Sequence, residues 1–313
     1  MASATKPPAF TTKQRVLLAL TAPLVPLFFC VAAGVAAICQ YNRDTAAMMP
    51  QPADFDVTVV VALALVPLRA LLVDRFSPIA HIALPPATRS IEFRVNRFAT
   101  SIFKLLYFSS MVGLGFWIQQ DEPWFPASLG GSGNASLAFA FVAQPPTDAV
   151  KLYMRVEMAY LAHNLLFVLC CKPFDGDTMD YVIHDLTGML LIGSSYLVNY
   201  IAMAATIAFL NDVADVVHYL YLMATDSRRP WIVAPIMAVF LIGWAYTRLY
   251  VFPRDCLLVT VVDAPRLDRH VSSLYLVPTN LLLTLLLGLQ VYWYQMLAGK
   301  GLRVLQTKTL WSL

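Results

Sequence analysis

The sequence predicts an all-α protein that crosses a membrane several times. Hydrophobic residues make up 59% of the 313 residues and charged residues only 13%, which is about half the charged share of an ordinary soluble domain. The apolar residues are gathered into blocks of about 18 to 25, the length that crosses a hydrocarbon core of about 30 Å as a helix. Such blocks are too long for barrel strands, and unpaired backbone groups in lipid would each cost several kcal/mol. We therefore expect a polytopic bundle of transmembrane helices.

The apolar blocks give about eight candidate spans in chain order. They cover residues 16–38, 57–73, 99–119, 150–171, 181–199, 200–222, 231–252 and 273–296. The N-terminus, MASATKPPAF, has no short apolar stretch that ends in a small-residue cleavage site. We therefore expect the first block to remain in the protein as a signal anchor.

The basic residues outside the spans indicate the orientation. A cytosolic N-terminus places most of these lysines and arginines on the cytosolic side, as the positive-inside rule requires. We therefore expect both termini in the cytosol, and the glycosylation sequon at Asn134 in a lumenal loop. The net charge of +3 reflects this bias. Without a basic face interleaved with aromatic residues, nucleic acid is not expected as a partner.

Ionisable side chains interrupt the block at residues 200–222. Asn211, Asp215 and His218 are spaced i, i+4, i+7 and share one helix face, which Asp212 borders. A carboxylate at the bilayer centre costs at least about 2.5 to 3.5 kcal/mol on insertion scales. A side-chain hydrogen bond between helices returns only about 0.6 kcal/mol on average. Packing alone therefore does not account for the two aspartates, and we expect a functional site.

Neighbouring blocks extend this cluster and leave three kinds of chemistry open. The block at 181–199 adds His184 and Asp185, and the block before it carries His163 and Asn164. In an acid–base or nucleophilic site, a carboxylate orients an imidazole whose other nitrogen takes a proton or an acyl group. A single metal could instead be held by His184, His218 and an aspartate. An ion or proton path also uses intramembrane acids, but no discontinuous-helix or inverted-repeat signal indicates a transporter. The first chemistry is favoured, with no metal and no cofactor.

From His184 onward the residues resemble the TLC domain, and within it the ceramide synthases. The family pattern opens with paired histidines, continues with Ser-Tyr-x-x-x-Asn and then His-Asp-x-Ser-Asp, and closes on Arg with Pro five residues later. The same positions here read His184-Asp185, Ser195-Tyr196 with Asn199, Asn211-Asp212-Val213-Ala214-Asp215, Trp244, Arg248 and Pro253. The resemblance implies a six-helix core in residues 89–300. A cytosolic tail and two spans would precede it in 1–88, and a short cytosolic tail would follow in 301–313.

The resemblance also implies an activity and its residues. It implies an acyl-CoA-dependent N-acyltransferase of the endoplasmic-reticulum membrane, acting on the amine of a long-chain sphingoid base. His184 would be the base or a transient acyl carrier, with Asp212, Asp215 and Asp185 as orienting acids. Substrate binding would fall to Asn199, Asn211, His218, Tyr196, Trp244 and Arg248. Acyl-CoA would be a co-substrate, the other partners would be membrane lipids, and a homo- or hetero-oligomer is left open.

The chain departs from the family pattern at positions that bear on activity. Asp185 replaces the second histidine, Gly188 a threonine, Ala202 an arginine, and Asn211 the histidine of the second motif. An aspartate cannot carry an acyl group as an acyl-imidazole. Adjacent helical residues also point about 100° apart, which makes direct help from Asp185 to His184 awkward. The alternative is therefore a TLC-domain protein without catalysis that binds, senses or organises membrane lipid. The catalytic interpretation leads us to expect that His184, Asp212 and Asp215 converge in a pocket that lipid chains can enter.

Overall fold

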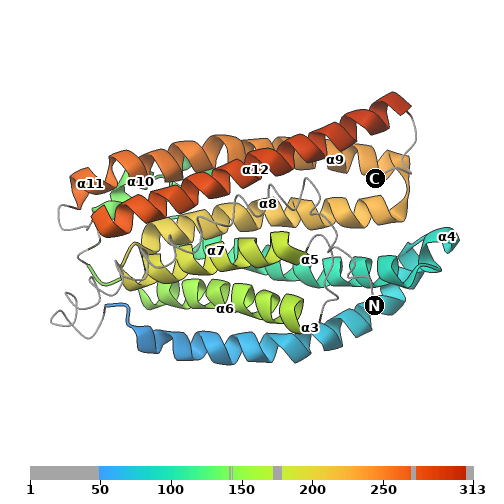
Figure 1. The fold of residues 1–313 in the computed structure, drawn as a ribbon, viewed down its shortest axis with the longest axis horizontal. Helices are drawn as coiled ribbons and strands as arrows, with labels where there is room; N and C mark the ends of the chain where they lie inside the picture. The colour runs from blue at the N-terminus through green and yellow to red at the C-terminus, as the bar shows by residue number, and fades with distance from the viewer. Residues whose placement is uncertain (1–48, 141, 143, 172–177, 269–272, 308–313) are drawn as a thin grey trace, which may run out of the picture.

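The computed structural model describes residues 49–140, 142, 144–171, 178–268 and 273–307. This part of the chain is helical almost throughout, with an isolated bridge between Pro126 and Gly133 and no longer strand. Its long helices lie side by side in one bundle (Figure 1). The prediction of an all-α fold is confirmed for this part. The expected first span, residues 16–38, lies outside the described residues.

The long helices correspond to the expected blocks from residue 57 onward. They are α3 (Phe55–Ala83), α5 (Glu92–Gln119), α6 (Asp148–Cys170), α7 (Thr178–Leu197), α8 (Ile201–Ser227), α9 (Pro230–Trp244), the π-helical segment η5 (Ala245–Leu257) and α12 (Ser273–Thr307). The short elements are η2 (Pro52–Asp54), α4 (Pro86–Arg89), η3 (Ala127–Leu129), η4 (Ala135–Phe139), α10 (Leu258–Val262) and α11 (Ala264–Leu267). The charges of Asp74 and Arg75 end the apolar block at residue 73, but α3 continues past them to Ala83.

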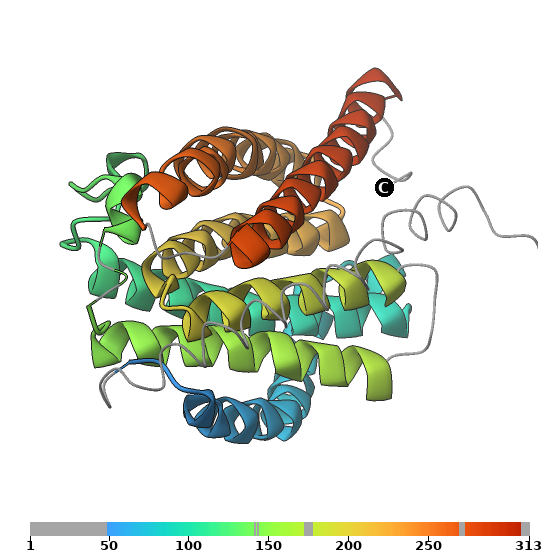
Figure 2. The ribbon, with the colours of Figure 1, turned by 60° about the vertical axis from the view of Figure 1, so that its left-hand side comes forward.

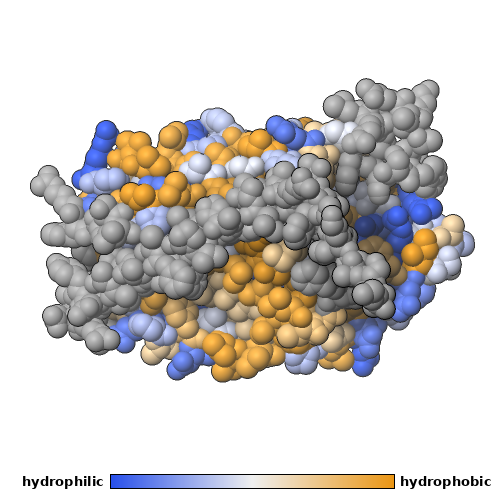
Figure 3. All heavy atoms as spheres, in the orientation of Figure 1, coloured by the Kyte–Doolittle hydropathy of each residue, from blue (hydrophilic) through white to orange (hydrophobic). Residues whose placement is uncertain are grey.

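Within the described residues, five helical stretches are long and apolar enough to cross a membrane. They are Pro52–Ala83, Glu92–Gln119, Ile201–Ser227, Trp231–Leu267 and Tyr275–Gly299. The helices α6 and α7, which correspond to the expected spans 150–171 and 181–199, are not among these stretches and lie alongside them (Figure 1). On the face that Figure 3 shows, apolar side chains gather across the middle of the helices, and hydrophilic ones lie toward the two ends. This distribution is typical of a protein whose middle section lies in the hydrocarbon core of a membrane.

The central helix of the bundle is α8. It packs against α5, α6, α7, α9 and η5, as the rotated view in Figure 2 shows. It is the most buried of the five candidate spans, and α3 is the least buried. Polar groups on α8 therefore face protein on most sides, which is where intramembrane ionisable residues are found.

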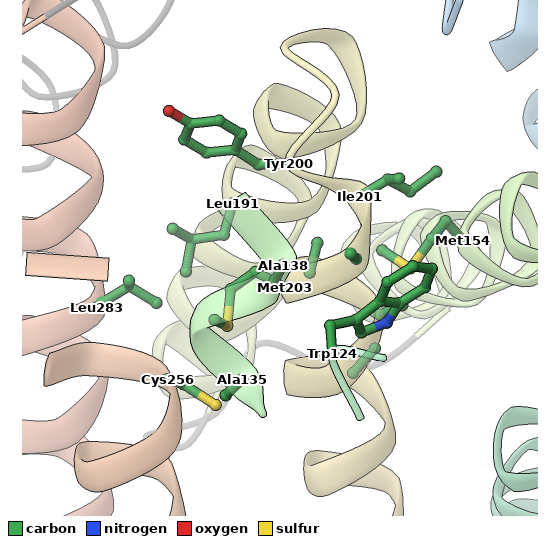
Figure 4. Packing of buried hydrophobic residues seen from close by; sticks show 14 of the residues in the cluster. Trp124, Ala135, Ala138, Met154, Leu191, Tyr200, Ile201, Met203, Cys256 and Leu283 are labelled. Carbon is green, nitrogen blue, oxygen red and sulfur yellow. The ribbon is translucent and has the colours of Figure 1, made fainter. Parts of the chain in front are cut away.

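The longest connection, between α5 and α6, covers one end of the bundle. Its Trp124, Ala135 and Ala138 belong to the main hydrophobic core together with Met154 of α6 and Met203 of α8 (Figure 4). The turn from α7 to α8 closes the same end. There Asn199 adopts a left-handed backbone with φ 61°, a conformation that asparagine tolerates better than most residues.

Candidate functional site

Asp212 lies buried between α8 and α6. The hydroxyl of Tyr153 donates a hydrogen bond to Asp212 Oδ2 at 3.3 Å. One turn further along α6, the buried carboxyl group of Glu157 lies within interaction distance of Asp212. Asp212 and Glu157 thus bring two carboxyl groups close together inside the bundle.

Glu157 was missed by the sequence analysis, although a signal was present. Tyr153, Glu157 and Asn164 are spaced i, i+4, i+11 and share one face of α6. In the structure, Tyr153 and Glu157 approach Asp212 of α8, whereas Asn164 bonds to Asp185 of α7. Reading the fourth apolar block for its polar periodicity could have found the pair.

Asp215 is paired with a cation from the π-helical segment. Arg248 Nη2 lies 2.9 Å from Asp215 Oδ1, and the arginine side chain is 3% exposed against 24% for the aspartate. The guanidinium carbon stands 4.4 Å from the centre of the Trp244 ring, which adds a cation–π contact. Trp244 in turn donates from Nε1 to the carbonyl of Gln290 on α12. A π-helical turn is a frequent mark of a functional position.

His218 and Asn211 are both engaged close to this ion pair. The ring of His218 packs against Phe240 and Trp244, with centroid distances of 5.5 and 6.5 Å. Asn211 donates from Nδ2 to the carbonyl of Ile207 in its own helix. The backbone carbonyl of Asn211 accepts from Arg248 Nη2 at 3.4 Å.

His184 makes a direct contact with Asp185, contrary to the difficulty expected for adjacent helical residues. His184 Nδ1 lies 3.3 Å from Asp185 Oδ1. The histidine side chain is 34% exposed, whereas that of Asp185 is 4% exposed. The His184 ring also lies 5.9 Å from that of Trp293 on α12. The imidazole is therefore held at one nitrogen while part of the ring remains open.

The described contacts place the expected catalytic residues in different hydrogen-bonded groups. His184 bonds to Asp185, Asp212 bonds to Tyr153, and Asp215 bonds to Arg248. No direct contact among the described residues joins His184 to either aspartate of α8. A metal site made by His184, His218 and an aspartate likewise does not form within this part of the chain.

Tyr196 and Asn199 lie toward the opposite end of α7 from His184. Twelve residues separate Tyr196 from His184, which is about 18 Å along a helix. The Tyr196 hydroxyl donates to Asp54 Oδ2 at 2.8 Å. Asn199 Nδ2 donates to the carbonyls of Val142 and Gln144 at 2.7 and 2.8 Å. Both residues hold other segments against the turn that joins α7 to α8.

A small pocket of about 30 Å³ lies between these two ends of α7. It is lined mainly by apolar side chains of α7, α8 and α12, among them Leu191, Ile207 and Leu283, with the hydroxyl of Ser195 on its wall. Its size matches about one water molecule. It marks a seam between three helices where the packing is incomplete.

Comparison with known proteins places this site in a family. The model of the TLC domain matches residues 97–298. "Ceramide synthase LOH2" of Arabidopsis thaliana is 23% identical over 269 residues, covering 81% of this chain and 88% of that protein. "ASC1-like protein 3" of Oryza sativa subsp. japonica is 20% identical over 221 residues, covering 69% and 75%. "Sphingosine N-acyltransferase lac1" of Schizosaccharomyces pombe is 26% identical over 164 residues, covering 50% and 40%.

The family match spans most of the chain and includes α6, α7, α8, η5 and most of α12, which carry His184, Asp212, Asp215 and Arg248. It begins after α3, whose residues stand outside the matched range. The chain belongs to the TLC-domain family.

Proposed function

We propose that this protein is a ceramide synthase-like N-acyltransferase, which joins a fatty acyl group from acyl-CoA to the amine of a long-chain sphingoid base. The observation that carries the proposal is the hydrogen bond from His184 to Asp185, which holds Nδ1 of a ring whose side chain remains 34% exposed. Support for the substrates comes from the family and from the relatives named as ceramide synthases and as a sphingosine N-acyltransferase.

The reaction assigned to His184 is aminolysis of a thioester. The ammonium of the sphingoid base first loses one proton to water. As the free amine attacks the acyl carbonyl carbon, Nε2 takes the second proton from the attacking nitrogen, the carbon–sulfur bond breaks, and the imidazolium passes that proton to the departing CoA thiolate. In the variant with an acyl carrier, Nε2 attacks first and expels the CoA thiolate, and the deprotonated amine then displaces the imidazole. In both cases Asp185 stabilises the charged ring, as the carboxylate of a catalytic triad does.

The place of His184 along α7 suits an acyl-CoA. His184 is six residues from the start of α7, about 9 Å along its axis. In the orientation with cytosolic termini, this end of α7 faces the cytosol, so the hydrophilic CoA portion stays in water. The acyl and base chains are lipid-dissolved, and a membrane cavity need only orient them. We place the acyl chain along the seam at Leu191 and Leu283, where the helices must move apart to admit it, because the pocket there has a volume of only about 30 Å³.

We propose roles around the substrates for the remaining polar residues, which do not line the pocket at Leu191 and Leu283. Asp212 and Asp215 would supply negative charge on α8, where Asp215 neutralises Arg248. The substrate would be contacted from α8 and the π-helical segment by Asn211, His218, Trp244 and Arg248. Tyr196 and Asn199 would bound the far end of the lipid chain. Around them we propose eight spans in the endoplasmic-reticulum membrane, with both termini cytosolic, no metal and no cofactor.

The second candidate is a TLC-domain protein that binds, senses or organises lipid without catalysis. It is favoured by Asp185, which stands where the family pattern has its second histidine, and by the protein partners that already engage Asp215 and Asn211. A lipid-binding role needs the seam between α7, α8 and α12 but no free imidazole nitrogen.

The two candidates are separated by incubating the purified protein with a sphingoid base and acyl-CoAs of several chain lengths. N-acylated product measured by mass spectrometry supports the enzyme, and its loss in His184→Ala supports the assigned role. His81→Ala is the matched control, because His81 is exposed in the last turn of α3. Absence of product with every acyl-CoA would leave the lipid-binding candidate, and full turnover in His184→Ala would remove the role of His184.

A further inference from the structure

A buried arginine outside the matched family range reaches the candidate site. Arg69 lies at the midpoint of α3 and is 6% exposed. Its guanidinium carbon stands 3.5 Å from the centre of the Phe167 ring on α6. A cation in the middle of a membrane helix is costly and is a functional-site hypothesis by default. The assigned reaction gives Arg69 no part.

Arg69 begins a chain of hydrogen bonds that ends on His184. Arg69 Nη1 donates to Asn164 Oδ1 at 3.2 Å. Asn164 Nδ2 donates to Asp185 Oδ2 at 2.7 Å. The other oxygen of Asp185 lies 3.3 Å from His184 Nδ1. The chain thus crosses three helices, α3, α6 and α7.

The chemistry of each link allows only one orientation. A guanidinium only donates hydrogen bonds and a carboxylate only accepts them. The Asn164 amide must therefore turn its oxygen to Arg69 and its nitrogen to Asp185. The negative charge of Asp185, taken out of water, is balanced through this amide by the charge of Arg69. With Asp185 ionised and fixed, His184 Nδ1 must carry the proton of that bond, and Nε2 keeps its lone pair.

We propose that Arg69 and Asn164 are positioning residues that fix Asp185, and through it the tautomer and orientation of His184. The inference rests on the proposed function only in taking His184 as the reacting group. It makes α3 part of the site. It also gives the departure at Asp185 a purpose, since an aspartate backed by Arg69 orients the histidine that precedes it.

The test measures the reactivity of His184 without requiring acyl transfer. The full chain in lipid nanodiscs is treated with diethyl pyrocarbonate at fixed pH, and modification of His184 is followed by peptide mass spectrometry. The reagent attacks an unprotonated imidazole nitrogen. Arg69→Met and Asn164→Leu should slow modification about fivefold, because the ring then also populates the tautomer with a proton on Nε2. Arg69→Lys keeps the charge and a donor for Asn164 Oδ1, and should react within about twofold of the wild type.

Gln119→Leu is the matched control for loss of a buried amide. Gln119 is fully buried and donates to the carbonyl of Gly115 in its own helix, so its removal should leave His184 reactivity unchanged. Wild-type modification rates in folded Arg69→Met and Asn164→Leu would overturn the inference, as would equal slowing in Gln119→Leu. If the wild type makes no N-acylated product but the reactivity pattern holds, the proposed function falls and the positioning role stands. If the wild type is active and the rates do not change, the positioning role falls alone.

Discussion

Arg248 of η5 and Asp215 of α8 form an ion pair in which the cation is far more buried than the anion. The pair ties the π-helical segment to the central helix. Arg248 also stacks on Trp244 and donates to the backbone carbonyl of Asn211. The guanidinium group therefore has three partners, and Asp215 is the one that neutralises its charge.

Removing Asp215 should cost more stability than removing the whole pair. Asp215→Asn leaves the guanidinium of Arg248 buried without a counter-charge, which we expect to lower the free energy of unfolding by about 3 kcal/mol. The double change Asp215→Asn with Arg248→Met removes the stranded charge and should recover part of that loss. Denaturant unfolding in mild detergent measures both. Equal losses in the single and double variants would show that the buried charge is not the cause.

The close packing at Gly115 leaves no room for a side chain beside Tyr153. A Cβ at Gly115 would stand 2.9 Å from the Tyr153 hydroxyl and 3.1 Å from Phe209 Cδ2. Gly115→Ala must therefore displace the hydroxyl that bonds Asp212, and overpacking of this kind costs about 1 to 3 kcal/mol. N-acylation should fall with it if Asp212 serves the site.

Gly113 supplies the matched control two residues away in α5. A Cβ there meets nothing within 4 Å, so Gly113→Ala should be neutral or stabilise the helix by up to about 1 kcal/mol. Both variants are compared by thermal unfolding in detergent and by turnover. A Gly115→Ala protein as stable and active as Gly113→Ala would mean that the tyrosine can move without consequence.

Two arginines of α5 hold one fully buried carboxylate at the end of α8. Asp226 accepts from Arg94 Nη1 at 3.0 Å and from Arg97 Nε at 2.9 Å. Asp226→Asn should cost about 3 kcal/mol, because the charge that both arginines approach is lost. Arg94→Gln should cost about 1 kcal/mol or less, since Arg97 still pairs with Asp226 and Arg94 is partly exposed. Thermal unfolding of the two variants checks the order, and a larger loss for Arg94→Gln would contradict it.

The sequence predicted the fold better than the site, and the residues show why. The apolar blocks predict the positions of the helices directly. In the hydrocarbon core, a segment of this length can satisfy its backbone N–H and C=O groups only by forming a helix. The polar face of α8 also follows from spacing within one helix. The partners of that face come from other helices, and spacing along the chain does not determine them. The resemblance assigns Arg248 to substrate binding, and its pairing with Asp215 was not predicted. Glu157 and Arg69 were missed.

The contact between His184 and Asp185 shows a second limit. An angle of about 100° between neighbours describes the direction of Cβ and not the reach of the side chains beyond it. Both side chains are long enough for their ends to meet at 3.3 Å. Asn164, on the neighbouring helix α6, then fixes the aspartate by a hydrogen bond. The sequence of α7 alone does not reveal this partner.

The sequon at Asn134 tests the proposed orientation. Asn134 is exposed, and its Oδ1 accepts from the backbone nitrogen of Ser136. Its amide nitrogen, where a glycan attaches, is directed elsewhere. The sequon stands at the start of η4, which contacts α10 and α11, and these two helices lie at the end of the bundle opposite α4 (Figure 1). If both termini are cytosolic, this end is lumenal and Asn134 should carry a glycan.

The protein is expressed in eukaryotic cells, and its gel mobility is compared before and after glycosidase treatment. The wild type should show a glycosidase-sensitive mobility shift that Asn134→Gln lacks. The control places a sequon at the other end of the bundle. Pro86→Asn gives Asn-Ala-Thr with Ala87 and Thr88 at an exposed position of α4. That site should stay unmodified, because the positive-inside rule puts the basic end of the bundle in the cytosol. A glycan on the new site, or none on Asn134, would contradict the proposed orientation. His184 would then lie toward the lumenal side, away from cytosolic acyl-CoA.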